Sequence, residues 1–451
     1  MSSAPAFELA PVQRTPLGES LERLQSLVSP LTGIVSATGE FMRMTDDARL
    51  VKIGAFVGDQ RALVGTELDN RPGGTSSDRS AALAAAIGEA AERYAASYLP
   101  RDRIRSGRAS ELANAVDPAR FALFSEEQYE QAGFLFVPFT DAVPIGWVDG
   151  VVLPDGRPAL LPAQLVFMSF ETAELLHEPR IGYTTSNGLA CGATREEAIV
   201  GALCELLERD AFMIPWEDRL SLPLLDWSGS GELTRHAERY FEPSGLDYAA
   251  VDLSAFWGVP TVLGIIRNRG EGASLGIGAS CAATIEAAWR SALGEAFSVR
   301  SWARSELYEG PPHTFDADFA NVAEFADHIS FHGDPRNHGA AAFLDAAPER
   351  RSTADVTPLP TENVLATLEA VCERLAAHGL TAYAIDVTTV DLRQAGLHVF
   401  KAVVPELCAL SALHTARFCG GRRLYDAAHE LGLVDAPLTY GDLNPFPHPF
   451  P

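Results

Sequence analysis

The sequence predicts a mixed α/β fold, with one large body behind a short N-terminal extension. Three long segments are helical by propensity, and the short runs of β-branched and aromatic residues between them are typical of strands. The 451 residues are 47% hydrophobic and contain no long low-complexity linker, so they are sufficient to bury a large core. The chain contains neither GxxxxGK(S/T) nor GxGxxG, so it shows no P-loop or Rossmann motif.

The N-terminal extension is expected over residues 1–65. Prolines among small polar residues predict a loose arm over residues 1–16. An amphipathic helix follows and ends near Pro30, and strand-like runs cover residues 41–44 and 51–57.

The main body is expected over residues 66–440 and opens with an Ala-rich helix over residues 80–98. Residues 147–153 and 159–166 flank a Pro-Asp-Gly turn, which predicts a β-hairpin. A second long helix is expected over residues 194–214. Its first residue is a threonine suited to an N-cap, and two glutamates follow in the first turn.

The second half of the body contains a third long helix and several strands. We expect these later elements at residues 273–279 (strand), 285–304 (helix), 363–378 (helix), 381–387 (strand) and 399–404 (strand). The tail, residues 441–451, ends in alternating prolines, which cannot continue a helix or an inner strand. We therefore expect the tail to be extended, near polyproline II.

The composition restricts the partners and the compartment of the protein. The chain has 35 basic and 60 acidic side chains, a formal net charge of −25, and no stripe rich in Lys or Arg. Nucleic acid and anionic membranes are therefore excluded as main partners. No targeting signal or membrane-length apolar run is present, which predicts a cytoplasmic protein. Six scattered cysteines without zinc-site spacing predict reduced thiols.

A repeated carboxylate–arginine unit is the most informative feature. Glu89-x-x-Glu92-Arg93 recurs 116 residues later as Glu205-x-x-Glu208-Arg209, each time within a predicted helix. Spacings of three and four residues place each unit on one helical face, opposite the apolar stripe. One such unit alone is usually a solvated face. Two copies, spaced by alanines, suggest surfaces that close over each other.

Clustered carboxylates repel one another unless a cation lies between them. Hard oxygen ligands of this kind suit Mg²⁺, which in turn suits a nucleoside triphosphate. Such a partner also explains how so acidic a chain can hold an anionic ligand. The residues alone carry the argument no further than this.

Three segments resemble the signatures of the YcaO superfamily. Residues 74–93 (GTSSDRSAALAAAIGEAAER) resemble the first signature, residues 186–210 (SNGLACGATREEAIVGALCELLERD) the second, and residues 292–300 (ALGEAFSVR) the third. The proline-alternating tail and Leu31-Thr-Gly-Ile-Val35 are similar to the branch that forms thiazoline and oxazoline rings in ribosomal peptides. The likeness covers about residues 30–451.

The resemblance implies a YcaO-type fold with two pseudo-repeated halves around a site for ATP and Mg²⁺. Five glutamates would hold Mg²⁺ ions and phosphates: Glu89, Glu92, Glu197, Glu205 and Glu208. Further residues would contact phosphates or orient the carboxylates: Arg93, Asn187, Glu197, Arg209, Arg300 and, as a support, Glu295. For Glu295, an ordinary glutamate on a helix face is an alternative of nearly equal weight.

The activity implied is that of an ATP-dependent cyclodehydratase subunit that forms ADP and phosphate. A Cys, Ser or Thr side chain of the peptide is the nucleophile, so the chain's own cysteines are expected in the core. The C-terminal carboxylate of Pro451, on a stiff arm with Pro447 and Pro449, would act near the substrate as a base or orienting group. The alternative is that the tail only packs across a groove.

This chain departs from the first signature at three positions. Thr75 and Ser76 replace a Lys-Gly pair, and Ala85 replaces a serine. These changes remove a cation and a hydroxyl, for which Arg71 or Arg79 are candidates to compensate. Three other functions stay open. They are thioamide or amidine formation at the same ATP site, an adenylate-forming ligase, and a non-catalytic scaffold of a modification complex, which the departures at Thr75 and Ala85 favour.

The resemblance also implies partners. These are a ribosomal precursor peptide, a ubiquitin-activating-enzyme-like protein that binds its leader, and a flavin-dependent dehydrogenase for any final oxidation, within an oligomer. Four other residues in the C-terminal half are candidates for proton transfer, although structural roles are commoner: His398, His414, Arg417 and His448.

Overall fold

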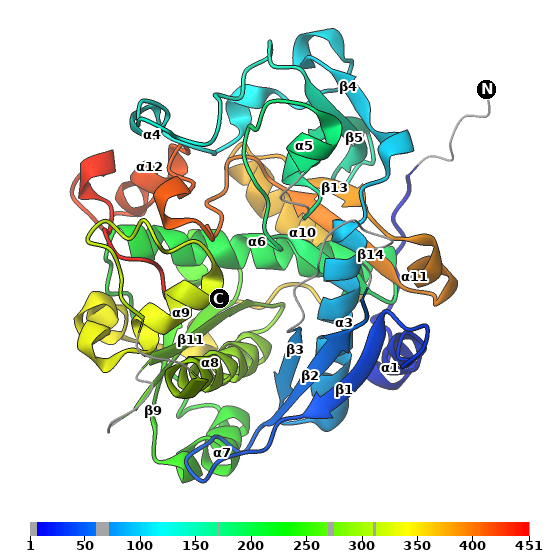
Figure 1. Ribbon diagram of the computed structural model, residues 1–451. Coiled ribbons are helices and arrows are strands. Elements are labelled where there is room, and N and C mark those ends of the chain that lie inside the picture. Colours follow the sequence, from blue (N-terminus) through cyan, green and yellow to red (C-terminus); the bar gives the residue numbers. More distant parts are fainter. Residues whose placement is uncertain (1–6, 60–71, 169–171, 269–274, 310–312, 451) are drawn as a thin grey trace.

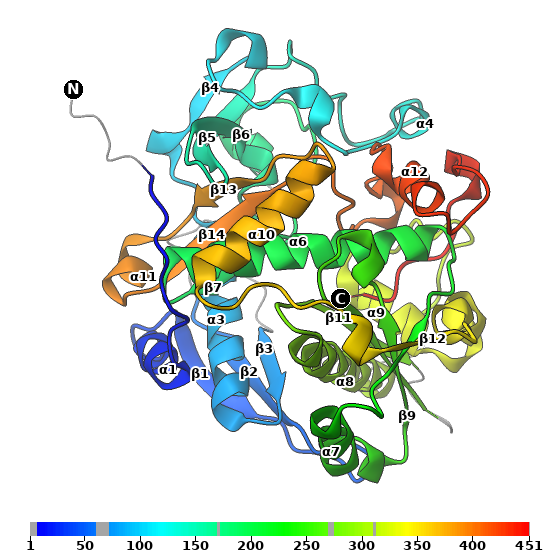
Figure 2. The ribbon, with the colours of Figure 1, turned by 180° about the vertical axis from the view of Figure 1, so that it is seen from behind.

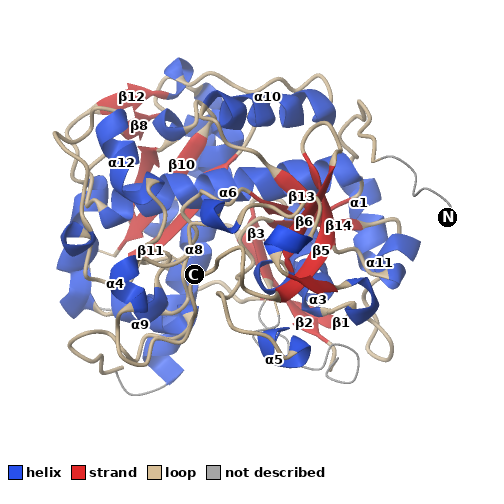
Figure 3. Cartoon of the chain, turned by 90° about the horizontal axis from the view of Figure 1, so that it is seen from above, coloured by secondary structure: helices blue, strands red, loops and turns tan. Residues whose placement is uncertain are grey.

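The computed structural model describes residues 7–59, 72–168, 172–268, 275–309 and 313–450. Within these ranges the chain folds into three sheets surrounded by helices, and α6 (Arg195–Glu217) runs across the middle of the molecule (Figures 1 and 2). Seen from above, the five-stranded sheet lies on one side of α6 and the other two sheets lie on the other side (Figure 3).

The first sheet has three antiparallel strands in the order β1 (Val35–Glu40), β2 (Val51–Val57) and β3 (Gly73–Ser76). Helices α1 (Leu17–Gln25) and α3 (Arg79–Ser97) pack against it. The sheet joins strands from both sides of residue 65, so the boundary expected there falls within one packed unit.

The second sheet has the order β4-β5-β13-β14-β7, with β6 paired to β5. Its strands are β4 (Arg105–Gly107), β5 (Ile145–Val152), β6 (Pro158–Pro162), β7 (Leu189–Gly192), β13 (Tyr383–Asp386) and β14 (His398–Val403). The predicted β5–β6 hairpin is confirmed.

The third sheet has the order β11-β10-β9-β8-β12, and only the β8–β12 pair is parallel. Its strands are β8 (Leu224–Asp226), β9 (Asp247–Asp252), β10 (Thr261–Arg267), β11 (Leu275–Cys281) and β12 (Arg350–Ser352). The other helices are α4 (Glu126–Tyr129), α5 (Thr172–Leu176), α7 (Gly231–Tyr240), α8 (Ile285–Glu309), α9 (Phe325–Gly333), α10 (Val364–Ala377), α11 (Val390–Gln394) and α12 (Arg423–Glu430). None of the helices in the described ranges is both long and apolar enough for a bilayer.

Three strand–helix pairs position the site: β3–α3, β7–α6 and β11–α8. The helices begin as their sequences predict, because Asp78 caps α3 and Thr194 forms a capping box at the start of α6. Glycines let strand and helix approach closely. A Cβ at Gly74 would lie 2.1 Å from the carbonyl oxygen of Ala82, and one at Gly278 would lie 2.5 Å from the Ala296 nitrogen.

Two local expectations in the N-terminal extension are wrong. Residues 41–44 form no strand. Phe41, Met42 and Met44 are exposed, and β1 ends before them at Glu40. Residues 7–16 are not loose either, since the Ala10 N–H donates to Glu196 and the Val12 carbonyl accepts from Val364. The prolines keep this arm extended, and α6 and α10 supply its partners.

Candidate functional site

Five glutamates converge from three helices. Glu89 and Glu92 lie on α3, Glu205 and Glu208 on α6, and Glu295 on α8. In each strand–helix pair, one glutamate faces a backbone N–H of the preceding strand sixteen residues earlier. Glu89 accepts from Gly73 at 2.7 Å, and Glu295 accepts from Ala279 at 2.9 Å. Glu205 faces the N–H of Leu189 in the same way. The acidic strand–helix unit therefore occurs three times.

The second glutamate of a unit binds the strand of the next unit. Glu92 accepts from the Cys191 N–H of β7 at 2.7 Å, and Glu208 accepts from the Cys281 N–H of β11 at 3.2 Å. The third unit has Ser298 at the equivalent position, three residues after Glu295. Two of the three junctions are thus closed by a carboxylate, and this arrangement brings the acidic faces of the three helices together.

Arg209 lies at the centre of this group. Its Nε is 3.2 Å from Glu208, and its Nη2 is 3.7 Å from Glu205 and 3.9 Å from Glu295. Its guanidinium stacks over the ring of Phe450, 4.1 Å from the ring centroid. The buried Nη1 has no hydrogen-bond partner among the described residues. One donor of this central cation is therefore available to a ligand.

Burial and mutual repulsion disturb the pKa values of the carboxylates. Burial raises the pKa of Glu92 and Glu208 well above the ordinary value, and neighbouring glutamates raise it further. Burial likewise raises the pKa of Glu205, against the opposing charges of Arg209 and Lys401, and raises that of Glu295 to about 7. A group of acids that resists ionisation in this way gains stability from an added cation.

The donor set fits Mg²⁺, because it consists of hard carboxylate oxygens next to an arginine with a free donor. As the side chains lie, their oxygens contact backbone N–H groups and Arg209. Accordingly, no cluster of three His, Cys, Asp or Glu side chains in the described ranges is spaced for a metal ion. Glu89, Glu92, Glu205 and Glu208 are the residues that would hold the metal, by exchanging these hydrogen bonds for it.

Glu197 contacts the N-terminal arm instead of this group. Its Oε1 accepts from the Thr15 N–H at 2.5 Å, and its Oε2 accepts from the Thr194 N–H at 3.2 Å. Both carboxylate oxygens of Glu197 thus accept hydrogen bonds from the arm or from the capping box. The spacing of Glu197 from Glu205 in the sequence does not reveal these contacts. A metal role for Glu197 stays a prediction and requires these bonds to open.

Asn187 lies in the turn before β7, where sequence reasoning missed its main partner, Lys401. The Lys401 Nζ donates to the carbonyls of Asn187 at 2.6 Å and Thr185 at 2.9 Å, while the Asn187 amide donates to Leu410. Burial lowers the Lys401 pKa to about 8, although the nearby Glu205 favours the charged form. The only sequence signal for this lysine is its place inside the apolar strand HVFKAV.

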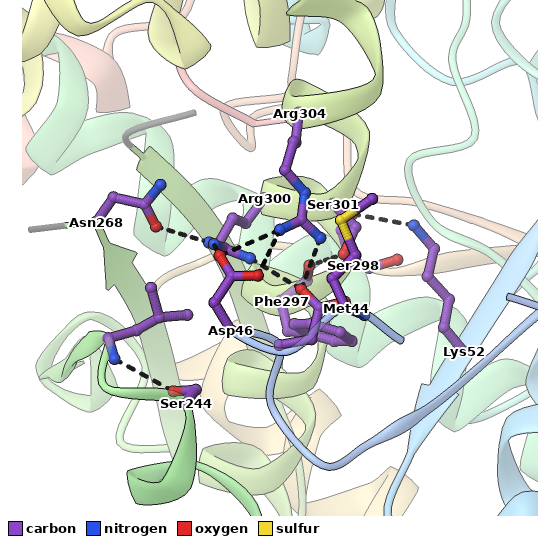
Figure 4. Close-up of polar contacts among 12 residues, drawn as sticks. Met44, Asp46, Lys52, Ser244, Asn268, Phe297, Ser298, Arg300, Ser301 and Arg304 are labelled. Atoms are coloured by element: carbon purple, nitrogen blue, oxygen red, sulfur yellow. Dashed lines mark hydrogen bonds and ion pairs between the residues drawn. The ribbon is translucent and has the colours of Figure 1, made fainter. Parts of the chain in front are cut away.

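Arg300 does not orient the site carboxylates, contrary to expectation. It donates to Asp46 at 2.7 Å and to Asn268 at 2.9 Å (Figure 4), and to Asp47 at 3.0 Å. Arg304 contacts the same two aspartates. The two arginines, of which Arg300 is fully buried, connect the loop before β2 to α8. A phosphate contact would require Arg300 to leave both carboxylates.

The departures at Thr75 and Ala85 lie at the β3–α3 contact. The Thr75 hydroxyl is buried, and within the described ranges nothing hydrogen-bonds to it. Arg79 pairs with Glu40 on the exposed surface, and Arg71 lies outside the described residues. Lys52 lies directly opposite Thr75 in the β2–β3 register and contacts the Ser298 carbonyl at 3.2 Å. It is the buried cation nearest to Thr75 in the sheet register.

The tail enters the site from the side of α6. Pro447 and Pro449 are buried, and Phe450 is fully buried against Arg209 and Phe212. Pro451 lies outside the described residues, so the role expected for its carboxylate stays a prediction. Of the predicted arginines, Arg93 pairs with Glu89 of its own helix at 2.6 Å.

Three carboxylates therefore surround one arginine in a fold whose sequence has no P-loop or Rossmann motif. A family model described as YcaO cyclodehydratase, ATP- and Mg²⁺-binding, matches residues 73–408. The chain therefore belongs to the YcaO family, and ATP and Mg²⁺ are the cofactors of that family.

The chain is also similar to one uncharacterized protein and to several solved structures. An uncharacterized protein of Methanothermobacter thermautotrophicus is 27% identical over 339 residues, which are 74% of this chain and 80% of that protein. A heterocyclase solved with substrate and cofactor has a TM-score of 0.79 at 23% identity, covering 99% of this chain and 59% of that chain.

Two further structures share the fold. For the heterocyclase TruD the TM-score is 0.70 at 21% identity, with 99% of this chain and 56% of that chain covered. For YcaO from Methanopyrus kandleri, bound with AMPPCP and Mg²⁺, it is 0.61 at 20% identity, with 88% and 94% covered. The chain thus spans less than two thirds of the length of the two heterocyclases.

Proposed function

We propose that this chain is an ATP-dependent cyclodehydratase subunit that converts Cys, Ser or Thr residues of a ribosomal precursor peptide to thiazolines or oxazolines. The observation that carries the proposal is that Glu205, Glu208 and Glu295 of two helices surround Arg209, and Phe450 of the tail lies against the same arginine. Glu89 and Glu92 of a third helix lie close enough to these glutamates to raise their pKa values or to have their own raised. The likeness to heterocyclases, one of them solved with substrate, supports the ring-forming reaction over other uses of ATP.

In the proposed reaction, a side-chain thiol or hydroxyl of the peptide attacks the preceding backbone carbonyl. The new C–S or C–O bond leaves a tetrahedral carbon whose oxygen is a poor leaving group. Bound MgATP supplies the phosphoryl group that makes this oxygen a good one, leaving ADP. Loss of phosphate and of the amide proton then forms the C=N bond of the ring, so the peptide loses one water.

The residues of this chain contribute positioning and charge neutralisation, which dominate phosphoryl transfer. The glutamates hold the cation, and the free Nη1 of Arg209 donates to an anionic oxygen. Lys401 and Glu205 hold the turn at Asn187 from two sides, because Lys401 binds its carbonyls while Glu205 faces its N–H groups. These contacts fix the turn at Asn187 before any ligand binds.

We further propose that turnover needs a ubiquitin-activating-enzyme-like partner that binds the leader peptide, within an oligomer. The similar Escherichia coli microcin synthetase was solved as a complex, McbBCD, with pro-MccB17 bound. A flavin-dependent dehydrogenase would carry out any later oxidation to azoles.

Mass spectrometry of the peptide product tests the reaction. The protein is incubated with the precursor peptide encoded beside it, the partner, ATP and Mg²⁺. We expect the loss of one water per ring together with ADP and phosphate. Exchange of oxygen for sulfur would show thioamide formation, and loss of water through an internal amine would show an amidine. AMP with pyrophosphate would identify an adenylate-forming ligase, and a complete lack of ATP consumption would identify a scaffold.

A further inference from the structure

The tail is rich in hydrogen-bond acceptors and poor in donors. Between residues 445 and 450, every second residue is a proline, which has a carbonyl but no N–H. A surface that binds such a segment must therefore supply donors to its carbonyls. The red end of the chain comes to lie beside α9 and α6 (Figure 1), and the donors come from there and from the loop near residue 414.

Three side chains contact the tail carbonyls. Two of them donate to the tail, whereas His328 faces a tail carbonyl with Nδ1 and the Ala412 carbonyl with Nε2, and its neutral ring donates to one of the two. Arg417 Nη1 donates to Asn444 at 2.7 Å, and His332 Nε2 donates to Pro447 at 2.6 Å. The Nδ1 of His328 lies 3.0 Å from the carbonyl oxygen of His448. His328 and His332 are four residues apart on α9, so both project from one helical face. We call His328, His332 and Arg417 the histidine groove.

The ring of His448, a residue of the tail, makes hydrogen bonds of its own and stacks on a residue of this groove. Its Nε2 lies 2.9 Å from the Ser411 carbonyl, and its Nδ1 accepts from the Phe450 N–H at 3.3 Å. These contacts require the neutral tautomer with the proton on Nε2. The ring also stacks on His328, with centroids 4.2 Å apart. Burial lowers the pKa of His448 well below its ordinary value, in agreement with the neutral form.

The groove determines where Phe450 lies. From Pro447 to Phe450 the tail is bound at three backbone groups. His332 contacts the Pro447 carbonyl, His328 contacts the His448 carbonyl, and the His448 ring accepts from the Phe450 N–H. Phe450 is then fully buried between Arg209 and Phe212. A shift of the tail by one residue would place a proline in this pocket and remove the aromatic face from the guanidinium.

We propose that His328, His332 and Arg417 are positioning residues that set the register of the tail, and thereby hold Phe450 against Arg209 in the carboxylate site. This inference rests on the proposed function for its catalytic consequence only. The docking of the tail is a property of the free protein, and it can be measured without ATP or peptide.

The first test compares two substitutions of His332. His332→Gln keeps an amide N–H near the position of Nε2, whereas His332→Phe keeps an aromatic ring beside Trp216 and removes the donor. We expect His332→Phe to lower kcat about tenfold, the effect of one lost buried hydrogen bond. KM for ATP should stay unchanged, and His332→Gln should retain most of the activity. Equal losses in the two variants would overturn the proposal.

A double variant separates register from general damage. In a chain shortened after Leu443, His332→Phe should cause no further loss of activity, because the segment that His332 positions is gone. A loss of the same factor in the full and shortened chains would show that His332 acts elsewhere, and would overturn the proposal.

Hydrogen exchange supplies the readout that does not depend on activity. The N–H groups of Phe446, His448 and Phe450 report on the tail of the ligand-free protein. We expect faster exchange in His332→Phe and near wild-type exchange in His332→Gln. Wild-type exchange rates in both variants would overturn the positioning role of the histidine groove. If exchange is altered as expected but the wild-type protein forms no rings, only the proposed function is refuted.

An insertion tests register without touching the groove. One alanine inserted after Pro447 keeps every residue of the histidine groove and moves Phe450 by one position; a wild-type circular dichroism spectrum serves as the check on folding. We expect activity to fall to that of the shortened chain. Wild-type activity of this variant would show that register has no role, even if the substitutions at His332 prevent folding.

Discussion

The two Glu-x-x-Glu-Arg units share one sequence pattern and differ in their surroundings. On α3, Arg93 pairs with Glu89 of its own helix, and their side chains are 20% and 33% exposed. On α6, Arg209 is 12% exposed and contacts carboxylates of α6 and α8 as well as the Phe450 ring. The motif therefore supplies the same groups twice, and in the second copy the arginine also contacts a carboxylate of another helix and an aromatic ring.

The difference shows what these further contacts add. An ion pair within one helix near solvent contributes little, whereas a buried cation that serves several carboxylates is difficult to replace. The first unit combines a buried carboxylate, Glu92, with the partly exposed Arg93–Glu89 pair, whereas the second unit provides a cation that several carboxylates share. The following predictions test this contrast, from the largest expected effect to the smallest.

Glu208→Gln should lower ATP consumption about 100-fold or more, because charge stabilisation through a bound metal ion is worth several kcal/mol. The matched control is Glu178→Gln. Glu178 is also a carboxylate whose pKa burial raises, but it accepts from Gln164 and Gly146 away from the site. The control should consume ATP at the wild-type rate in a coupled ADP assay. Similar rates for both variants would place the metal elsewhere.

Arg209→Met should lower the free energy of unfolding by about 3–5 kcal/mol in Mg²⁺-free buffer, since it leaves buried carboxylates without their cation. Arg93→Met should lower it by only about 0–1 kcal/mol. Urea unfolding measures both values, and added Mg²⁺ should recover part of the loss in Arg209→Met. Equal effects at the two positions would contradict the contrast between the units.

Without Mg²⁺, the free energy of unfolding should fall as pH rises from about 4.5 towards 7, because the buried glutamates of the site lose their protons. The folded pKa of Glu295 is raised from 4.5 to about 7, and burial raises the folded pKa values of Glu92 and Glu208 well above 4.5. In this window the folded state binds more protons than the unfolded state, so deprotonation favours unfolding. Urea midpoints across this range, with and without Mg²⁺, measure the effect. If Mg²⁺ does not reduce this dependence of stability on pH, these carboxylates do not bind the metal.

Phe450→Leu should lower the free energy of unfolding by about 0.5–2 kcal/mol, the range for a desolvated cation–π contact, while keeping an apolar side chain in place. In the Arg209→Met background the same substitution should cost less, because the cation is absent. Additive losses would show that Phe450 acts only by filling space.

The long helices, their caps and the acidic faces were predictable from the sequence, because they depend on residues within one or two turns. Thr194 forms the expected capping box, and α3 and α8 begin within one residue of their predicted starts. The strand at residues 41–44 was wrong because apolar side chains there indicated burial, while the tertiary structure leaves them exposed.

The sequence by itself determined which groups are available: two acidic units, a third helix with Glu295, and a tail without N–H donors at every second position. Only the tertiary structure decided that Glu92 meets Cys191, that Arg300 binds Asp46 and Asp47, and that the tail ends against Arg209. Periodicity and capping act over a few residues, whereas these contacts join residues 99 to 254 positions apart. Such contacts depend on how the sheets pack around α6, which no local pattern encodes.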